Sequence, residues 1–334
     1  MTAPPAATRR LRDHGHVIGH FEPGPDNAIT DVPSVRVGQT TVLDDTRGVY
    51  SGVTAIVPPA RVVPAGFHVV NGYGKFVGAT QVMELGEVET PVLLTSTLST
   101  FRVADALLSW VLDHAAGPVT SVNPVVGEIN DSWLSSVEPR PVTAEHVYAA
   151  LDGARGGPVA MGNVGGGTGA CALGFKAGIG TASRMVPLQD GGPVTVGVLV
   201  QANMGGELRL LGRTVTPESL GLPRPGPAGE QGSCVVVVAT DAGCDARQLT
   251  RIAARGVLAL GRVGAGYSHG SGDYGLAFSA GRGMLRPPDL DQVFRAVLES
   301  VEEAVIDALL AARTVRTPSG RQAVALPHEV VGSS

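Results

Sequence analysis

The run from Cys234 to Thr240 reads Cys-Val-Val-Val-Val-Ala-Thr, with no polar side chain before its final threonine. A strand with one solvated face alternates apolar and polar residues, whereas this run is apolar at nearly every position. It therefore predicts a strand that is buried on both faces, in the centre of a sheet. Because one face can meet a second sheet and the other can meet helices, we expect a layered α/β fold, an alpha-beta-beta-alpha sandwich.

The rest of the chain supplies strands and helices for such layers, and it contains no internal repeat. Short runs, most of them rich in β-branched or aromatic residues and with Gly or Pro nearby, predict strands. These are Val53–Val57, Val92–Ser96, Val119–Val126, Val194–Ala202, Cys234–Thr240 and Tyr274–Ala280. Apolar residues spaced by three and four, or a Pro-Pro start, predict helices at Val103–Ala115, Asp245–Leu260 and Asp289–Ala312.

The length of 334 residues allows about two domains, although a layered α/β fold of this size can form one unit. Residues 1–16 lack periodicity, so we expect a disordered tail there and a single domain over residues 17–334. His14, His16 and His20 lie in or near this tail without Cys, Asp or Glu partners at metal-ligand spacing. A surface tail is favoured over a metal site.

Composition excludes several classes of partner. The net charge is −5 and no basic stripe is present, which argues against nucleic acid. No apolar run approaches the roughly 18 residues that a membrane-spanning helix needs, and the N-terminus lacks a secretory signal pattern. Three cysteines fit unpaired thiols in a reducing cytoplasm. We expect a cytoplasmic protein that binds no membrane.

We expect neither a cofactor nor a metal ion. The glycine-rich segment 162–170 has a weak similarity to a dinucleotide fingerprint, but Asp190 begins a turn and does not end a second strand. A backbone that lines a site closely, or that donates N–H groups to an oxyanion, is the better interpretation of these glycines.

The junction between Gly232 and Ser233 carries the first chemical signal. A loop rich in proline and glycine, residues 214–232, passes directly into the buried strand. Cleavage before Ser233 would give it a free α-amine with a pKa of about 7.7 to 8, able to take the proton of its own hydroxyl. One residue would then supply nucleophile and base. The alternative is an ordinary loop that ends at a strand.

The second signal is the segment 267–273, Tyr-Ser-His-Gly-Ser-Gly-Asp, between a predicted helix and a predicted strand. Ser271 and Asp273 are two residues apart and share one face of an extended chain. If the two strands that flank the helix are parallel neighbours, this pair lies beside Ser233. The alternative is a polar turn that caps a strand. A nucleophile elbow at Ser268 is disfavoured, because that motif needs the strand first and the helix second.

Two further segments hold candidate binding residues. Asn203 lies on the more polar face where a valine-rich strand ends, and its amide could donate to an oxyanion or close a turn. Glu128 and Trp133 follow an apolar strand and could bind an ammonium group by charge and cation–π contact. A solvated loop with a packed tryptophan is the alternative.

Together these segments resemble the L-aminopeptidase/D-amino-acid esterase family, which includes the β-peptidyl aminopeptidases and has nylon-oligomer hydrolases as relatives. The similar segments extend over nearly the whole chain after the tail: residues 29–38, 89–95, 174–184, 200–203, 232–233, 270–273 and 326–327. The resemblance implies a sandwich similar to N-terminal-nucleophile hydrolases and ornithine acetyltransferases. It also implies a precursor that cuts itself between Gly232 and Ser233 into residues 1–232 and 233–334.

The resemblance also implies roles for the site residues. Ser233 would be the nucleophile, oriented and polarised by Ser271 and Asp273. Asn203 would help to hold the oxyanion, and Glu128 and Trp133 would line the pocket for the free amino group of the substrate. Family members often carry Glu where this chain has Asp273, and Tyr at or near Trp133. The family further suggests homo-oligomers, tetramers of cleaved pairs.

We therefore expect a self-processing N-terminal-serine aminopeptidase or amidase that acts on short peptides, amides or esters, with β- or D-amino-acid substrates among them. The alternatives within enzymes are an amidase for linear ω-amino-acid oligomers and an ornithine-acetyltransferase-like acyl transferase. The alternative outside enzymes is a protein that only binds a small ligand with an amino group.

Overall fold

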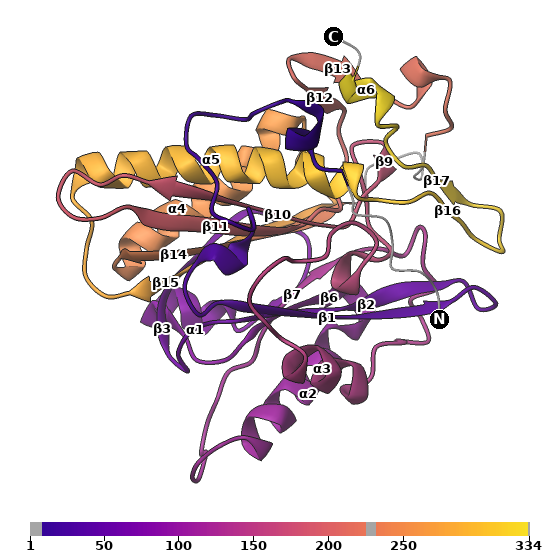
Figure 1. Ribbon diagram of the computed structural model, residues 1–334. Helices are drawn as coiled ribbons and strands as arrows, with labels where there is room; N and C mark the ends of the chain where they lie inside the picture. The colour runs from indigo at the N-terminus through magenta and orange to yellow at the C-terminus, as the bar shows by residue number, and fades with distance from the viewer. Residues whose placement is uncertain (1–8, 225–231, 333–334) are drawn as a thin grey trace.

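The computed structural model describes residues 9–224 and 232–332, and two sheets lie face to face in it with helices on both outer sides (Figure 1). The larger sheet contains, in order across it, β10 (Ile179–Val186), β11 (Val194–Gln201), β14 (Ser233–Gly243), β15 (Gly272–Gly281), β3 (Val63–Gly72) and β5 (Glu87–Val88). The smaller sheet contains β1 (Arg36–Asp44), β2 (Val49–Val57), β6 (Val92–Ser96), β7 (Val125–Ile129) and β4 (Phe76–Val77).

Helices cover the outer face of each sheet. The larger sheet is covered by α4 (Ala246–Leu258) and α5 (Pro287–Leu310), and the smaller by α2 (Thr100–Asp113) and α3 (Ala144–Asp152). The remaining short elements include α1 (Ala79–Leu85), α6 (Glu329–Gly332), β8 (Cys171–Ala172), β9 (Phe175–Lys176), β12 (Leu208–Leu210), β13 (Arg213–Val215), β16 (Val315–Arg316) and β17 (Gln322–Ala323). The predicted alpha-beta-beta-alpha sandwich is confirmed.

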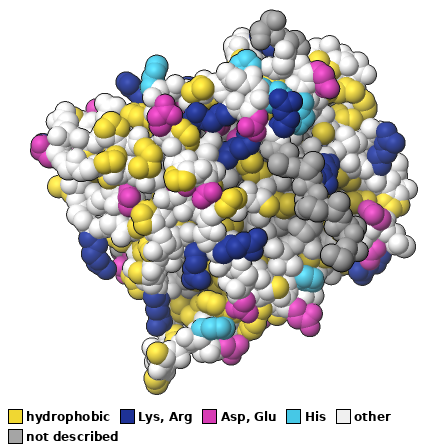
Figure 2. Space-filling view, in the orientation of Figure 1, with side chains coloured by type: hydrophobic (Ala, Val, Ile, Leu, Met, Phe, Trp, Pro, Cys, Tyr) yellow, Lys and Arg dark blue, Asp and Glu magenta, His cyan; other side chains and the backbone are white. Residues whose placement is uncertain are grey.

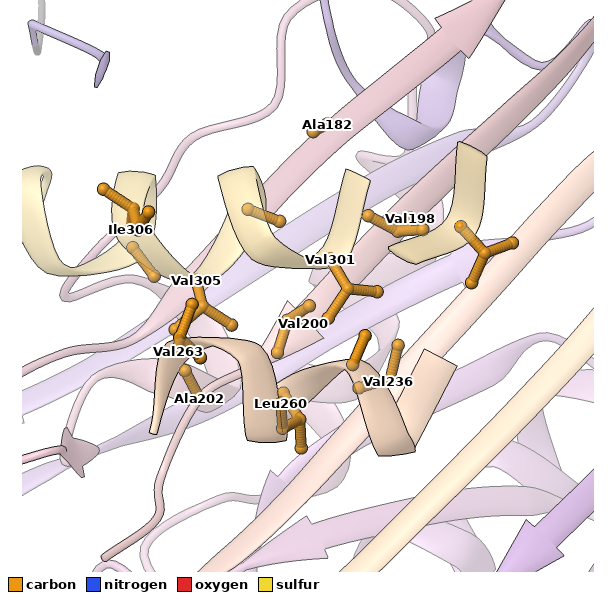
Figure 3. Packing of buried hydrophobic residues seen from close by; sticks show 14 of the residues in the cluster. Ala182, Val198, Val200, Ala202, Val236, Leu260, Val263, Val301, Val305 and Ile306 are labelled. Atoms are coloured by element: carbon orange, nitrogen blue, oxygen red, sulfur yellow. The ribbon is translucent and has the colours of Figure 1, made fainter. Parts of the chain in front are cut away.

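The valine run of β14 separates two apolar layers. Val236 and Val238 belong to the cluster under α4 and α5, whereas Val235 and Val237 belong to the cluster between the two sheets. Figure 3 shows the first of these layers, where α5 lies over β11 with Val236 of β14 nearby. All four valines are completely buried. The absence of alternation in the sequence therefore has the predicted cause, which is burial on both faces.

Most predicted elements are confirmed, with shifts of a few residues at their ends. The prediction of a strand over Val119–Val126 is wrong for residues 119–124, because β7 begins only at Val125. Pro118 precedes this stretch and Pro124 ends it, and a proline has no N–H group for a sheet hydrogen bond.

Residues 9–16 differ from the expected disordered tail, whereas residues 1–8 lie outside the described residues. Leu11 is completely buried, and its N–H donates to the Asp307 carboxylate of α5 over 2.8 Å. The Arg10 guanidinium lies 2.7 Å from the same carboxylate. A buried acid on α5 therefore holds this segment, and a sequence pattern within residues 1–16 does not reveal such a distant partner.

The surface agrees with the expected absence of a basic stripe on the face that Figure 2 shows. Lys and Arg side chains on this face are scattered among Asp and Glu and form no continuous basic area. Within residues 9–224 and 232–332, no helix has the length and apolar character needed to cross a membrane.

Candidate active site

The Gly232-Ser233 junction lies at one edge of the larger sheet, where β14 and β15 both begin. These strands are parallel neighbours, and Ser233 is paired in register with Gly272. The helix α4 connects them, as a strand-helix-strand unit requires. The predicted parallel pairing is confirmed, and it brings Ser233 next to the segment that carries Ser271 and Asp273.

The peptide bond between Gly232 and Ser233 is held on both sides. The Ser233 N–H donates to the Asn203 carbonyl over 2.7 Å, and the Gly232 carbonyl accepts the Gly272 N–H over 3.2 Å. A Cβ atom on Gly232 would lie only 2.8 Å from the Cα of Met204. The glycine thus allows the chain to pass close to the Asn203–Met204 backbone, and two hydrogen bonds then fix the orientation of the bond.

Ser271 and Asp273 form a buried pair beside this peptide bond. The Ser271 hydroxyl donates to Asp273 Oδ1 over 2.8 Å, and both residues are at most 2% exposed. Asp273 Oδ2 has no hydrogen-bond partner among the described residues. Burial raises the pKa of Asp273 above its ordinary value, against the opposing effect of the Ser271 hydrogen bond. This carboxyl group therefore takes up a proton more readily than an exposed aspartate does.

Asn203 connects the junction to the neighbouring loops. Its backbone carbonyl accepts the Ser233 N–H, and its side-chain oxygen accepts the Cys171 N–H over 3.0 Å. Its side-chain NH₂ donates to the Asn130 carbonyl over 3.1 Å. Since an amide NH₂ has two hydrogens, one donor of Asn203 is available for a further acceptor.

A cavity of about 430 Å³ opens at Ser233. Its lining combines the β3–β4 connection with the ends of the two sheets: Gly72, Tyr73, Gly74, Lys75, Thr97, Glu128, Asn130, Ser233 and Gly270. Glu128 is 1% exposed, and its Oε1 accepts the Lys75 N–H over 3.1 Å. Its Oε2 has no hydrogen-bond partner among the described residues. The cavity thus contains a hydroxyl group of Ser233 and a carboxyl oxygen that is ready to accept a donor.

Burial and Lys75 have opposite effects on the pKa of Glu128. Burial raises the pKa of Glu128 above its ordinary value, whereas the positive charge and N–H group of Lys75 lower it. The Lys75 ammonium lies 3.8 Å from Glu128 Oε1 and donates to the Thr97 hydroxyl over 2.8 Å. Lys75 therefore favours the ionised form of this carboxyl group, whereas burial disfavours it.

Trp133 is not brought together with the other candidate residues. The chain turns after Asp131, and Trp133 packs against a small apolar cluster of Tyr50, Leu134 and Ala323. It does not line the cavity at Ser233. Asn130, two residues after Glu128, occupies the cavity wall instead.

The glycine segment 162–170 does not supply oxyanion donors, contrary to one interpretation of its sequence. Gly165–Gly167 form a buried 3₁₀ turn against β2, in which the N–H of Gly166 donates to the Thr54 hydroxyl over 3.1 Å. The N–H groups of Gly165 and Gly167 donate to Thr41 and Val164. These glycines allow close packing and do not reach the cavity.

Several residues of this region were not predicted from sequence. Lys75, Thr97 and Asn130 line the cavity, and the buried Asp131 interacts electrostatically with both Glu128 and the buried Lys176. Burial raises the pKa of Asp131 to about 7 and lowers the pKa of Lys176 to about 8. The signal that could have found both lysines is rarity, because Lys75 and Lys176 are the only two in the chain.

No group of three or more His, Cys, Asp or Glu side chains that could hold a metal ion occurs within the described ranges. The polar groups at and around Ser233 are hydroxyls, two carboxyl groups, an ammonium and two amides. Such a set can activate a hydroxyl nucleophile, bind a cationic group and donate to an oxyanion.

Comparison with known proteins agrees with this arrangement. Beta-peptidyl aminopeptidase BapA of Sphingosinicella xenopeptidilytica is 38% identical, over 96% of this chain and 89% of the relative. A beta-aminopeptidase from Burkholderia sp. has a structure with a TM-score of 0.90, at 39% identity and 97% coverage of both chains.

A third similar structure is the L-aminopeptidase D-Ala-esterase/amidase from Ochrobactrum anthropi, described as a prototype for the serine aminopeptidases and a variant of the Ntn hydrolase fold. Its TM-score is 0.85, at 35% identity and 96% coverage of both chains. Residues 27–323 of the present chain, which include every candidate site residue, match a single family of peptidases. The chain belongs to peptidase family S58.

Proposed function

We propose that this protein cuts its own chain between Gly232 and Ser233 and then uses Ser233 as an N-terminal nucleophile. It hydrolyses the N-terminal residue of short peptides, amides or esters through an acyl-enzyme. The observation that carries the proposal is the position of Ser233, which lies at a held peptide bond and lines a cavity together with Glu128.

Self-cleavage follows from the groups around the peptide bond. The Ser233 oxygen attacks the Gly232 carbonyl carbon, a C–O bond forms, the C–N bond breaks, and the hydroxyl proton ends on the released amine. Water then hydrolyses the ester, which leaves a Gly232 carboxylate and a free Ser233. The Gly272 N–H, which donates to the Gly232 carbonyl, stabilises the negative charge that develops on this oxygen. Asp273 acts on the reaction through the Ser271 hydroxyl.

Substrate turnover repeats this chemistry with the new amine as base. The amine takes the Ser233 hydroxyl proton, and the oxygen attacks the substrate carbonyl. The remaining donor of the Asn203 amide holds the oxyanion, and Glu128 Oε2 accepts the substrate ammonium. Proton transfer to the leaving amine and hydrolysis of the ester by water complete the cycle.

The substrate class rests on the named relatives. Two of them are beta-aminopeptidases and a third is an L-aminopeptidase D-Ala-esterase/amidase, so β- and D-amino-acid derivatives belong to the proposed range. We further propose a cytoplasmic protein, which the three free cysteines support, and an assembly of four cleaved pairs. Sedimentation equilibrium of the purified protein tests the assembly, and fractionation of the source cells tests the location.

The decisive experiment is the denatured intact mass of the purified protein. We expect two fragments, residues 1–232 and 233–334, with Ser233 as the first residue of the smaller one. Ser233→Ala removes the nucleophile, so this variant stays full length and hydrolyses no substrate. Ser109→Ala on the outer helix α2 is the control, because it removes a serine hydroxyl that bonds within its own helix, and it should leave cleavage intact.

A single full-length mass in wild-type protein, or turnover by Ser233→Ala, contradicts the proposal. Substrates separate the alternatives for the reaction. β-Alanyl, D-alanyl and aminohexanoyl amides distinguish the aminopeptidase from an ω-amino-acid oligomer amidase. Acyl transfer to ornithine without net hydrolysis would indicate the acyltransferase.

A further inference from the structure

The cavity at Ser233 contains a cationic side chain that the proposed mechanism does not use. Lys75 projects from the β3–β4 connection, with its ammonium 2.8 Å from the Thr97 hydroxyl and 3.8 Å from Glu128 Oε1. Its side chain is 35% exposed, whereas that of Glu128 is almost completely buried. Lys75 and Glu128 therefore form a partly exposed ion pair on the wall of the substrate cavity.

This arrangement creates a charge imbalance for a substrate that carries only an ammonium group. Such a group would reach Glu128 Oε2 and would share one carboxylate with Lys75. Two cations held by the same carboxylate repel each other, and the repulsion is stronger in a largely buried cavity than in water. A substrate with a second, negative group beside its ammonium would remove the imbalance, because that group would pair with Lys75.

We propose that the cavity recognises an acyl group that carries a carboxylate beside its free amino group, as a β-aspartyl residue does. Glu128 binds the substrate ammonium and Lys75 binds the substrate carboxylate. Each charge of the substrate therefore faces an opposite charge of the protein. The inference rests on the proposed function, since it names the acyl group that Ser233 accepts.

A β-aspartyl group also fits the reaction chemically. It is a β-amino acyl group in which the carbon that bears the amine also bears a carboxylate. Its scissile carbonyl therefore has the same relation to the amine as in a β-alanyl group. A cavity of about 430 Å³ has room for a group of this size.

The other groups that act electrostatically on this site do not replace Lys75. Glu128 influences Asp131, which follows β7, and Tyr274, on β15. Both acids become harder to ionise through burial, which raises the pKa of Tyr274 to about 12 and that of Asp131 to about 7. Neither can supply a positive charge, whereas Lys75 is the cation that lowers the pKa of Glu128. Recognition of a substrate carboxylate in this cavity thus depends on Lys75.

The test compares three p-nitroanilides on the cleaved enzyme: β-alanyl, β-homoalanyl and β-aspartyl. The β-homoalanyl group has a methyl in place of the carboxylate and is the matched neutral substrate. We expect kcat/KM to be at least tenfold higher for the β-aspartyl than for the β-homoalanyl substrate. The difference should come from a lower KM for the β-aspartyl substrate, with similar kcat values. Lys75→Met should reduce this ratio to about one, because the positive charge that would pair with the substrate carboxylate is lost. Lys75→Arg should keep the preference.

Arg295→Met is the control variant, because it removes one positive charge from the exposed side of α5. It should keep the wild-type ratio. Circular dichroism melting of each variant verifies folding, and Lys75→Gln repeats the measurement with a polar side chain if Lys75→Met does not fold. Two outcomes overturn this inference but leave the proposed function standing. One is turnover of the β-homoalanyl substrate without any preference for the β-aspartyl substrate, and the other is a preference that remains after Lys75 is replaced. If none of the three substrates is hydrolysed, the proposed function itself is contradicted.

Discussion

At the scale of single residues, the burial of Asp273 should affect the rate of self-cleavage, because burial changes the pH at which this carboxyl group ionises. Burial raises the pKa of this carboxyl group, and the carboxylate form is the one that polarises Ser271. Activity should therefore decline on acidification at a pH above the ordinary aspartate value, because the group becomes protonated earlier than an exposed one. The expected acid limb is measured as the self-cleavage rate against pH, by intact mass.

Asp273→Asn should slow self-cleavage by about 10²- to 10⁴-fold, the usual contribution of a positioned acid or base, and abolish that acid limb. Asp273→Glu restores a carboxylate and should recover part of the rate. An asparagine variant that cleaves at the wild-type rate and with the same pH profile would show that Asp273 has no part in the reaction.

The residues of the site differ in how far the sequence reveals them. Ser271 and Asp273 could be placed beside Ser233 because parallel pairing of two consecutive strands brings their starts to one edge. Glu128 could be named by its charge after an apolar strand. Lys75 and Asn130 were missed because their position in the cavity depends on how two sheets face each other. No local pattern records that arrangement.

At the scale of elements, the contact of α4 with the larger sheet depends on glycine. A Cβ atom on Gly275 of β15 would overlap the carbonyl oxygen of Ala253, which belongs to the helix backbone. The helix therefore lies directly on the strand that leads from Ser271 and Asp273. Gly275→Ala must displace α4 or β15 and should lower the free energy of unfolding by about 1–3 kcal/mol.

The matched substitution is Gly256→Ala, on the buried side of α4 itself. Its Cβ would lie 3.2 Å from methyl groups of Val236 and Val238, which are ends of side chains and not backbone. The gain in helix propensity, about 1 kcal/mol, offsets this crowding, so we expect a change near zero. Urea denaturation measures both variants. Equal effects at the two positions would contradict the importance of the backbone contact.

The strand β10, which the sequence pattern missed, has a physical reason for being missed. The strand β10 contains Thr181, Ser183 and Arg184, all of them buried. Their polar groups bond to distant partners: the Thr181 and Ser183 hydroxyls accept the N–H groups of Ile29 and Gly24, and Arg184 pairs with Glu303. A pattern read along the chain treats such residues as solvated. The valine run of β14 could be recognised because apolar side chains need no specific partner.

At the scale of the whole molecule, a buried ion network joins the N-terminal segment to the long helix α5. Glu303 of α5 is completely buried and accepts hydrogen bonds from Arg12, Asn27 and Arg184 over 2.6–2.8 Å. Burial acts to raise the pKa of Glu303, but the bonds and charges of Arg12 and Arg184 outweigh it and lower the pKa. The ion network of Glu303 therefore stabilises the fold fully above the ordinary glutamate pKa. This stabilisation is lost as the pH falls through the lowered pKa of Glu303.

Glu303→Gln should lower the free energy of unfolding by about 3 kcal/mol at neutral pH, because it leaves buried guanidinium groups without their shared carboxylate. The loss should shrink as the pH falls through the lowered pKa of Glu303, because the wild-type carboxyl group then also becomes protonated. The neighbouring Glu302 pairs with Arg262 at the surface, so Glu302→Gln should cost less than about 1 kcal/mol. Denaturation at several pH values tests both, and a pH-independent loss for Glu303→Gln would contradict the ionic origin.

The sheet topology predicts what would happen to the two fragments of the proposed cleavage. The strands β14 and β15 belong to the fragment 233–334, but β14 pairs with β11 and β15 pairs with β3, both from the fragment 1–232. The Glu303 network crosses between the same fragments. Separation would break two rows of backbone hydrogen bonds and expose the apolar layers on both sides of β14. The cleaved fragments should therefore remain one folded body without a covalent link.

We expect native size-exclusion chromatography to give one peak that contains both fragment masses, with separation only in denaturant. Reducing agent should make no difference, because the cysteines of the two fragments, Cys171 on one side and Cys234 and Cys244 on the other, are unpaired. The melting transition of the cleaved protein should be cooperative, since each fragment alone leaves the central strands of the larger sheet without one of their two neighbours. Elution of the two fragments in separate native peaks would contradict this account of how the sheet holds them together.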